Sequence, residues 1–139
     1  MEQFQETTEK APIKVLVIDD NRNHAEGLSE LLGLAGFDAR HVFTGADGIE
    51  MARRLSVDAV LLDMNLPLKS GADVLRRLRS SSRLAQIPAI VMTSSRSQLE
   101  RDEIMRLGAS AFFHKPISYS EFMDIGKLMR SLLPEAKTN

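Results

Sequence analysis

Short apolar runs alternate with longer amphipathic stretches along most of this 139-residue chain. The short runs are rich in β-branched residues and the longer ones repeat apolar positions at helical spacing, a pattern typical of a parallel sheet with crossover helices. We predict strands at residues 13–18, 37–43, 57–62, 88–92 and 109–113. We predict helices at residues 21–35, 45–54, 71–80, 97–107 and 118–133. The pattern therefore predicts a (βα)5 domain.

Four of the predicted helices begin at a capping box, in which Ser or Thr is followed three residues later by an acidic residue. The four pairs are Thr44 with Asp47, Ser70 with Asp73, Ser97 with Glu100, and Ser118 with Glu121. Each pair lies where the apolar pattern changes from strand to helix. Gly36 and Gly108 follow the first and fourth helices, at the place of a C-terminal cap.

The two ends of the chain are predicted to lie outside the domain. We expect a flexible N-terminal extension at residues 1–12, the domain at residues 13–133 and a C-terminal tail at residues 134–139. The sequence shows no internal repeat and no second domain.

Composition narrows the classes of function. The chain has no cysteine, which excludes disulfides, thiolate metal sites and thiol nucleophiles. A formal net charge of −1 provides no bulk attraction to nucleic acid or to an anionic membrane. No apolar stretch approaches the ~20 residues of a membrane span, and the polar, acidic start does not resemble a secretion signal. We therefore expect a cytoplasmic protein that binds neither nucleic acid nor membrane.

Three of the apolar runs end on polar residues that together suit phosphoryl transfer. The first strand leads into Asp19 and Asp20, the third into Asp63, and the fifth into His114 and Lys115. Neighbouring parallel strands end on one edge of the sheet, so we expect these groups to meet there. Packed carboxylates are costly unless a cation binds among them, and Mg²⁺ prefers oxygen ligands. The sequence thus predicts a magnesium site with an ammonium group beside it.

Each of these residues has a simpler interpretation when it is taken alone. Asp20 or Asn21 could merely cap the first helix, and Asp63 could be a turn residue. A single exposed lysine such as Lys115 is usually a solvated charge. The combination at the ends of three strands favours the functional interpretation.

The order and spacing of five motifs resemble the receiver domain of bacterial two-component response regulators. The motifs are Val17-Ile18-Asp19-Asp20-Asn21, Leu61-Leu62-Asp63-Met64-Asn65-Leu66-Pro67 with Gly71, Ile90-Val91-Met92-Thr93-Ser94, Gly108-Ala109, and His114-Lys115-Pro116. The resemblance covers residues 13–133 and is closest in kind to stand-alone, single-domain regulators. It implies a flavodoxin-like three-layer α/β sandwich with a five-stranded parallel sheet in the order 2-1-3-4-5.

The resemblance also implies a role for each polar residue at the strand ends. Asp63 would be the phosphoacceptor, taking a phosphoryl group from a partner histidine kinase or histidine phosphotransfer protein. Asp20, Asp63 and the backbone carbonyl of Asn65 would bind Mg²⁺ directly, and Asp19 would act through a water molecule. Lys115 would pair with the acceptor carboxylate and then with the phosphoryl oxygens. Such a protein catalyses its own phosphotransfer and autodephosphorylation, and it is not an enzyme with an external substrate.

Two further residues match the switch of the family. Thr93 stands where relatives carry a hydroxyl that reorients toward the phosphoryl group. Phe112 stands where many relatives carry a tyrosine that follows this hydroxyl, and it could equally be a plain core residue. The Lys115–Pro116 bond matches one that is usually cis in the family, so we predict a cis bond.

We expect output through a phosphorylation-dependent contact with a downstream protein. The last predicted helix carries more apolar residues than one buried stripe needs. These residues are Tyr119, Phe122, Met123, Ile125, Leu128, Met129, Leu132 and Leu133. A homodimer through the fourth helix, fifth strand and fifth helix is a further use of such a surface. A basic cluster at Arg76, Arg77, Arg79 and Arg83 is interpreted as a solvated helix face, with a nucleic-acid patch as the less favoured alternative.

Two other classes of function remain open at this point. A magnesium-dependent phosphohydrolase also uses aspartates at strand ends, but it typically needs an acid/base aspartate two residues beyond the nucleophile, where this chain has Asn65. A degenerate receiver would act as a docking module without phosphorylation. The intact set of Asp19, Asp20, Asp63, Thr93 and Lys115 argues against that interpretation.

Overall fold

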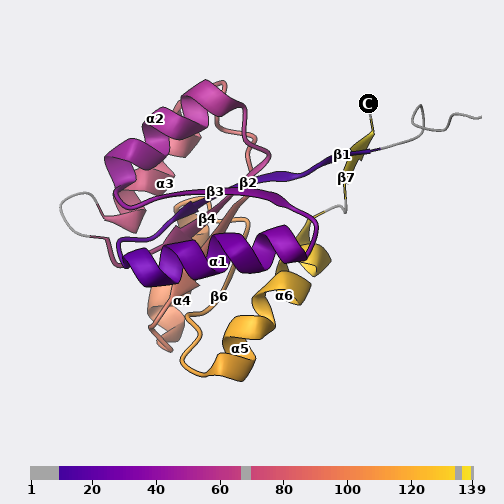
Figure 1. Cartoon of the computed structure of the whole chain (residues 1–139). Helices are drawn as coiled ribbons and strands as arrows, with labels where there is room; N and C mark the ends of the chain where they lie inside the picture. The colour runs from indigo at the N-terminus through magenta and orange to yellow at the C-terminus, as the bar shows by residue number, and fades with distance from the viewer. Residues whose placement is uncertain (1–9, 67–69, 134–135, 139) are drawn as a thin grey trace, which may run out of the picture.

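A five-stranded parallel sheet lies between two layers of helices in the computed structural model, which describes residues 10–66, 70–133 and 136–138 (Figure 1). Residues 1–9 of the predicted extension and Pro67 of the quoted motif lie outside the described residues. The strands of the sheet are β2 (Lys14–Ile18), β3 (Asp38–Val42), β4 (Ala59–Asp63), β5 (Ala89–Thr93) and β6 (Ala111–His114). The helices are α1 (Arg22–Leu34), α2 (Gly45–Leu55), α3 (Gly71–Ser80), α4 (Gln98–Arg106), α5 (Tyr119–Met123) and α6 (Ile125–Leu132).

The order of strands in the sheet is β3-β2-β4-β5-β6. Numbered along the chain within this sheet alone, that order is 2-1-3-4-5, so the predicted α/β topology is confirmed. In the register, Ile18 of β2 is the partner of Leu62 of β4, and Thr93 of β5 is the partner of His114 of β6. The register therefore brings together the strand ends that carry the polar residues or directly precede them.

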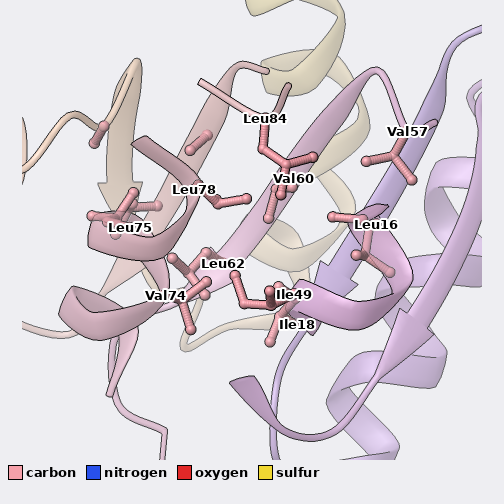
Figure 2. Packing of buried hydrophobic residues seen from close by; sticks show 14 of the residues in the cluster. Leu16, Ile18, Ile49, Val57, Val60, Leu62, Val74, Leu75, Leu78 and Leu84 are labelled. Carbon is pink, nitrogen blue, oxygen red and sulfur yellow. The ribbon is translucent and has the colours of Figure 1, made fainter. Parts of the chain in front are cut away.

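One face of the sheet is covered by α2, α3 and α4. Leu16 and Leu62 point to this face and pack with Val74 and Leu78 of α3, all of them buried (Figure 2). Burying a side chain of this size contributes about 1.5–3 kcal/mol. This cluster fixes the strands that precede Asp19 and Asp63.

The opposite face is covered by α1 and α6. Val17 and Leu61, which alternate with the residues of the first cluster, pack with Leu28 of α1 and Met129 of α6. All four side chains are buried. Because β2, β4 and β5 are covered on both faces, their sequences read as nearly continuous apolar runs.

All four predicted capping residues form the N-cap hydrogen bond of their helix. The hydroxyl oxygens of Thr44, Ser70, Ser97 and Ser118 accept hydrogen bonds from the backbone N–H three residues later, over 3.0, 3.3, 3.4 and 3.1 Å. The start of α1 is capped by the side chain of Asn21, which accepts from the N–H of His24. The predicted glycine caps are also confirmed, since Gly36 and Gly108 have φ values of 100° and 110°, a conformation that other residues rarely adopt.

The last predicted helix is divided at Asp124 into α5 and α6. The N–H of Asp124 is shared between the carbonyls of Ser120 and Glu121, at 3.1 Å each. Such sharing tightens the last turn of a helix toward 3₁₀ geometry. Ile125 and Met129 are buried, whereas Tyr119, Leu128 and Leu132 are 78%, 40% and 44% exposed. The apolar band of this segment therefore extends beyond the core, as its width predicts.

Short strands form near both ends of the chain, within the predicted N-terminal extension and C-terminal tail. Lys10–Pro12 (β1) pairs antiparallel with Ala136–Thr138 (β7) in a separate two-stranded sheet, which extends from the body of the domain (Figure 1). The pairing joins segments more than 120 residues apart in the sequence. The strand propensity of three polar or small residues cannot indicate which distant segment will pair with them.

Arg79 is not part of a solvated basic face, and this corrects the interpretation of the arginine cluster. Its guanidinium donates to the carbonyls of Gly108, Ala85 and Ile87 at 2.8, 3.2 and 2.8 Å. Burial lowers the pKa of Arg79. The side chain thus joins α3 to the connections that precede β5 and β6. Arg76 and Arg77, by contrast, are exposed.

Replacing Arg79 by alanine should destabilise the fold by about 2–4 kcal/mol, because three carbonyls lose a charged donor. Urea unfolding followed by circular dichroism measures the change. Arg77→Ala on the same helix is the matched control and should stay within about 0.5 kcal/mol of the wild type. Equal stabilities for the two variants would show that the Arg79 hydrogen bonds are not structural.

Candidate functional site

The ends of β4, β5 and β6 are held together by backbone hydrogen bonds beyond the strands themselves. The N–H of Met64 donates to the carbonyl of Met92 at 3.0 Å, and the N–H of Lys115 donates to the carbonyl of Thr93 at 2.8 Å. The residues that follow the strands are therefore as firmly placed as the strands. This is the edge at which open α/β sheets bind ligands.

Three carboxylates converge at this edge. Asp19, Asp20 and Asp63 each offer an oxygen atom that lies within 4.8 Å of the other two. The side chains of Asp19 and Asp63 are fully buried, whereas Asp20 is exposed. The convergence expected from the sequence is therefore present, and it opens to solvent on the side of Asp20.

Both oxygens of Asp63 have partners on the protein. The ammonium group of Lys115 donates to Oδ2 at 2.8 Å, and the backbone N–H of Asn65 donates to Oδ1 at 3.0 Å. Asp63 and Lys115 are 52 residues apart in the sequence. Their ion pair is thus a product of the sheet topology and not of local structure.

Both oxygens of Asp19 are also engaged. The backbone N–H of Asn21 donates to Oδ1 at 3.0 Å, and the Nδ1 atom of His24 is hydrogen-bonded to Oδ2. The two donors belong to the first turn of α1 and its cap. The same turn that starts α1 therefore orients a buried carboxylate of the site.

Burial and charge act against each other on the ionisable groups. Burial raises the pKa of Asp63, and the opposing effects of Lys115 and the Asn65 N–H do not cancel this rise. Burial also raises the pKa of Asp19, but hydrogen bonds from His24 and Asn21 outweigh it, so the net pKa of Asp19 is lowered. For Lys115, burial lowers the pKa, yet the pairing with Asp63 outweighs burial and raises the pKa overall.

The donor set fits a hard divalent cation. Three carboxylates against the single ammonium group of Lys115 leave two negative charges uncompensated when all are ionised. Carboxylate oxygens at this spacing are the ligands that Mg²⁺ takes, and Mg²⁺ keeps several waters besides. The solvent-exposed side at Asp20 leaves room for such waters.

A short hydroxyl and amide network surrounds Thr93 at the end of β5. The Thr93 hydroxyl accepts from the N–H of Ser95 at 3.0 Å, and the Thr93 side chain is buried. The side-chain amide of Asn65 donates to the Ser94 hydroxyl at 3.1 Å. The loop after β4 is thereby joined to the loop after β5 beside the carboxylates.

Phe112 lies on β6, half-buried against the cluster on the α4 side of the sheet. The guanidinium carbon of Arg101 lies 5.1 Å from the centroid of its ring, within the range of a cation–π contact. The geometry therefore gives Phe112 a packing role in this structure and leaves its switch role as a prediction.

The predicted cis bond is wrong. The described part of the chain contains no cis peptide bond, so Lys115–Pro116 is trans. The trans form is the one that X–Pro bonds favour intrinsically, by about 0.5–1 kcal/mol. The backbone hydrogen bond from Lys115 to Thr93 and the ion pair to Asp63 are both formed with this isomer.

Gly71, which the motif includes, permits a close approach at the end of β4. A Cβ atom at this position would lie 2.6 Å from Cα of Met64 and 3.0 Å from the carbonyl oxygen of Asp63. Both contacts are with backbone, which cannot move aside without displacing Asp63. Only glycine therefore allows α3 to begin so near to the end of β4.

His24 is the site residue that the sequence analysis missed. Its position in the sequence could have indicated its place at the site. His24 is the third residue after the Asn21 cap, in the turn that directly follows Asp19 and Asp20. The first turn of a helix that follows a strand lies over the end of that strand. A polar side chain there is therefore within reach of the site.

Comparisons with known proteins agree with this geometry. A family model described as the response regulator receiver domain matches residues 15–126. The polar-differentiation response regulator DivK of Brucella anthropi is 27% identical over 113 residues, which cover 81% of this chain and 92% of DivK.

Solved structures share the fold. Chemotaxis response regulator CheY4 of Vibrio cholerae superposes with a TM-score of 0.79 at 23% identity, covering 88% of this chain and all of CheY4. The receiver domain of sensor histidine kinase PA1611 of Pseudomonas aeruginosa superposes with a TM-score of 0.72 at 24% identity, covering 85% of this chain and 97% of that domain. That structure holds a magnesium ion in its active-site cleft. Among the described residues of this chain, no helix has the length and apolar character to cross a bilayer.

Asp63→Asn should stabilise the protein at neutral pH in the absence of divalent cations. The raised pKa of Asp63 means that the folded state binds this proton more tightly than the unfolded state does. Stability is therefore lost as pH rises through the raised pKa, and the asparagine avoids this loss. Urea unfolding in a chelator at several pH values measures the difference.

The gain should shrink as pH falls, because Asp63 itself then becomes neutral in the wild type. Asp102→Asn on the exposed face of α4 is the matched control and should show no such trend. A destabilised Asp63→Asn at neutral pH would contradict the account of the charges.

Proposed function

The chain belongs to the response regulator receiver domain family, and from this we propose that Asp63 accepts a phosphoryl group from a phosphohistidine on a partner protein. The donor would be a histidine kinase or a histidine phosphotransfer protein. The observation that supports this assignment most is the ion pair of the buried Asp63 with Lys115, beside the carboxylates of Asp19 and Asp20. Asp63 is the member of the three that is both buried and bonded to the ammonium group.

We assign the cation of the site as Mg²⁺. Asp20, Asp63 and the backbone carbonyl of Asn65 would bind it directly, and Asp19 would bind it through a water molecule. When bound, Mg²⁺ supplies positive charge that balances the carboxylates and the incoming phosphoryl oxygens. The closeness of the three carboxylates and the magnesium ion in the related PA1611 receiver support this assignment.

In the transfer itself, a carboxylate oxygen of Asp63 bonds to phosphorus while the bond from phosphorus to the histidine nitrogen breaks. The histidine of the partner leaves with the electron pair of that bond, and Asp63 becomes an acyl phosphate. Lys115 remains beside the reacting carboxylate and pairs with the phosphoryl oxygens. Phosphoryl transfer of this kind needs positioning and charge neutralisation and no protein general base.

We propose that the Thr93 hydroxyl changes its orientation when Asp63 is phosphorylated. Its hydroxyl accepts from the N–H of Ser95 in this structure, and it would turn to donate to a phosphoryl oxygen on Asp63. Movement of Thr93 would free space for the ring of Phe112 to move inward from its place beside Arg101. Since Phe112 has no hydroxyl, its movement would change the shape and the apolar area of the surface and would offer a partner no hydrogen bond.

Output would come from a contact with a downstream protein or with a second copy of the chain. The proposed surface is formed by α4, β6, α5 and α6, the elements that follow Thr93. Exposed apolar side chains on it include Leu99, Met105, Tyr119 and Leu128. Such side chains are typical of sites that bind partners.

The phosphohydrolase alternative is less well supported. Asn65 stands where an acid/base aspartate would be needed, and its side-chain amide donates to Ser94. An amide cannot deliver and take back a proton at this position as a carboxyl can. The docking-module alternative is disfavoured because the ion pair and the carboxylate cluster are both formed.

Incubation with Mg²⁺ and a small phosphodonor such as phosphoramidate should add one phosphoryl group to the wild type. Asp63→Asn should remain unmodified, because an amide oxygen is not a comparable nucleophile, while the matched exposed variant Asp102→Asn should react as the wild type does. Intact mass spectrometry measures the adduct, which should be lost on mild base treatment, as expected of an acyl phosphate.

Three other results would contradict the proposal. Modification of Asp63→Asn to the same extent would place the acceptor elsewhere. Many turnovers of a phosphomonoester without an adduct would favour the hydrolase. No adduct with the phosphodonor or with candidate kinases would favour the docking module.

A further inference from the structure

His24 is joined to the carboxylate cluster by a single polar contact. Its Nδ1 atom is hydrogen-bonded to Oδ2 of Asp19. An ionised carboxylate can only accept hydrogen bonds, so Nδ1 is the donor. The other carboxylate oxygen accepts from the N–H of Asn21. The first turn of α1 thus holds both oxygens of a carboxylate that is fully buried.

The imidazole ring is held in turn by α5. The rings of His24 and Phe122 lie with their centroids 5.8 Å apart and their planes inclined by 51°. Phe122 also reaches α1 at Gly27, where an added Cβ atom would lie 2.9 Å from Cζ of the ring. Close packing on this side leaves the His24 ring little freedom to rotate.

The two ring nitrogens differ in what they can still bind. Nδ1 is turned to Asp19, whereas Nε2 is buried and makes no hydrogen bond within the described part of the chain. A nitrogen that binds a metal must present a free lone pair to it. Nδ1 carries the hydrogen directed at Asp19, and Nε2 is enclosed. The ring is therefore arranged to orient Asp19 and not to bind a cation directly.

We propose that His24 is a positioning residue for the cation, holding Asp19 in the orientation that receives a metal-bound water. This inference rests on the proposed function, because it concerns the cation site assigned there. Partners of this kind fix the direction of a ligand before the metal arrives, and their loss typically lowers metal affinity about 10- to 100-fold. Because Asp19 would act through a water molecule in the proposed site, the lower end of that range is expected.

The test measures divalent-cation affinity directly. Electron paramagnetic resonance of free Mn²⁺ gives the Mn²⁺ affinity, and competition by Mg²⁺ gives the Mg²⁺ affinity. His24→Ala should weaken binding of both cations by about 10-fold. His24→Asn should restore affinity to within about threefold of the wild type, because its amide N–H can take the place of the Nδ1 donor.

His41→Ala is the matched control, since His41 is hydrogen-bonded to Ser29 on the α1 face of the sheet. It should bind both cations as the wild type does. Circular dichroism confirms that each variant is folded, and the asparagine variant keeps the test informative if the alanine variant is not.

The outcomes separate this inference from the proposed function. If the wild type binds neither cation, the assignment of the cation site is wrong, and the positioning role of His24 is overturned as well. If the wild type binds but His24→Ala binds equally well or more tightly, only the positioning role is overturned. A directly bound nitrogen in the spin-echo spectrum of the wild-type Mn²⁺ complex would make His24 a ligand and also overturn that role. So would a folded His24→Asn variant as weak as His24→Ala.

Discussion

Repulsion among the carboxylates of Asp19, Asp20 and Asp63 is the constraint on which the rest of the site depends. Isolated in solution, such groups would move apart or take up protons. Here they cannot separate, because Asp19 and Asp20 directly follow β2, Asp63 is the last residue of β4, and neighbouring strands hold both β2 and β4 by hydrogen bonds. Their negative charge is offset by positive charge, first from Lys115 and then from any cation that binds at this edge. The site is thus sensitive to any change of charge within it.

The scaffold connects this charge cluster to distant surfaces through short, rigid links. Lys115 contacts Asp63 by its side chain and Thr93 by its backbone, so β5 and β6 share one fixed point at the site. On the other side, Asp19 is joined through His24 to Phe122 on α5. The second link ends on α5, where the apolar side chains of Tyr119 and Met123 remain exposed. A change at the carboxylates therefore has a physical route to the surface proposed for output.

Much of this arrangement is predictable from the sequence because its causes are local or periodic. The capping boxes at Thr44, Ser70, Ser97 and Ser118 mark helix starts by hydrogen bonds that span three residues. The buried strands are evident from continuous apolar runs, and parallel order brings their ends together. Convergence of the strand-end residues follows from these two facts.

What the sequence does not reveal depends on contacts between distant segments. Arg79 looks like its exposed neighbours on α3, yet it binds three carbonyls that only the folded chain brings to it. The pairing of β1 with β7 and the contact of His24 with Phe122 are of the same kind. The trans bond at Lys115–Pro116 was mispredicted for a different reason. The prediction relied on the isomer that is usual in the family, and that does not determine the isomer in one chain.

The most direct test of the account is anomalous diffraction from crystals of the protein soaked in Mn²⁺. The account predicts one strong anomalous peak at the carboxyl edge of the sheet, bonded to oxygen atoms of Asp20 and Asp63. A peak elsewhere, or fully ordered crystals with no peak at that edge, would contradict the claim that these carboxylates form a cation site.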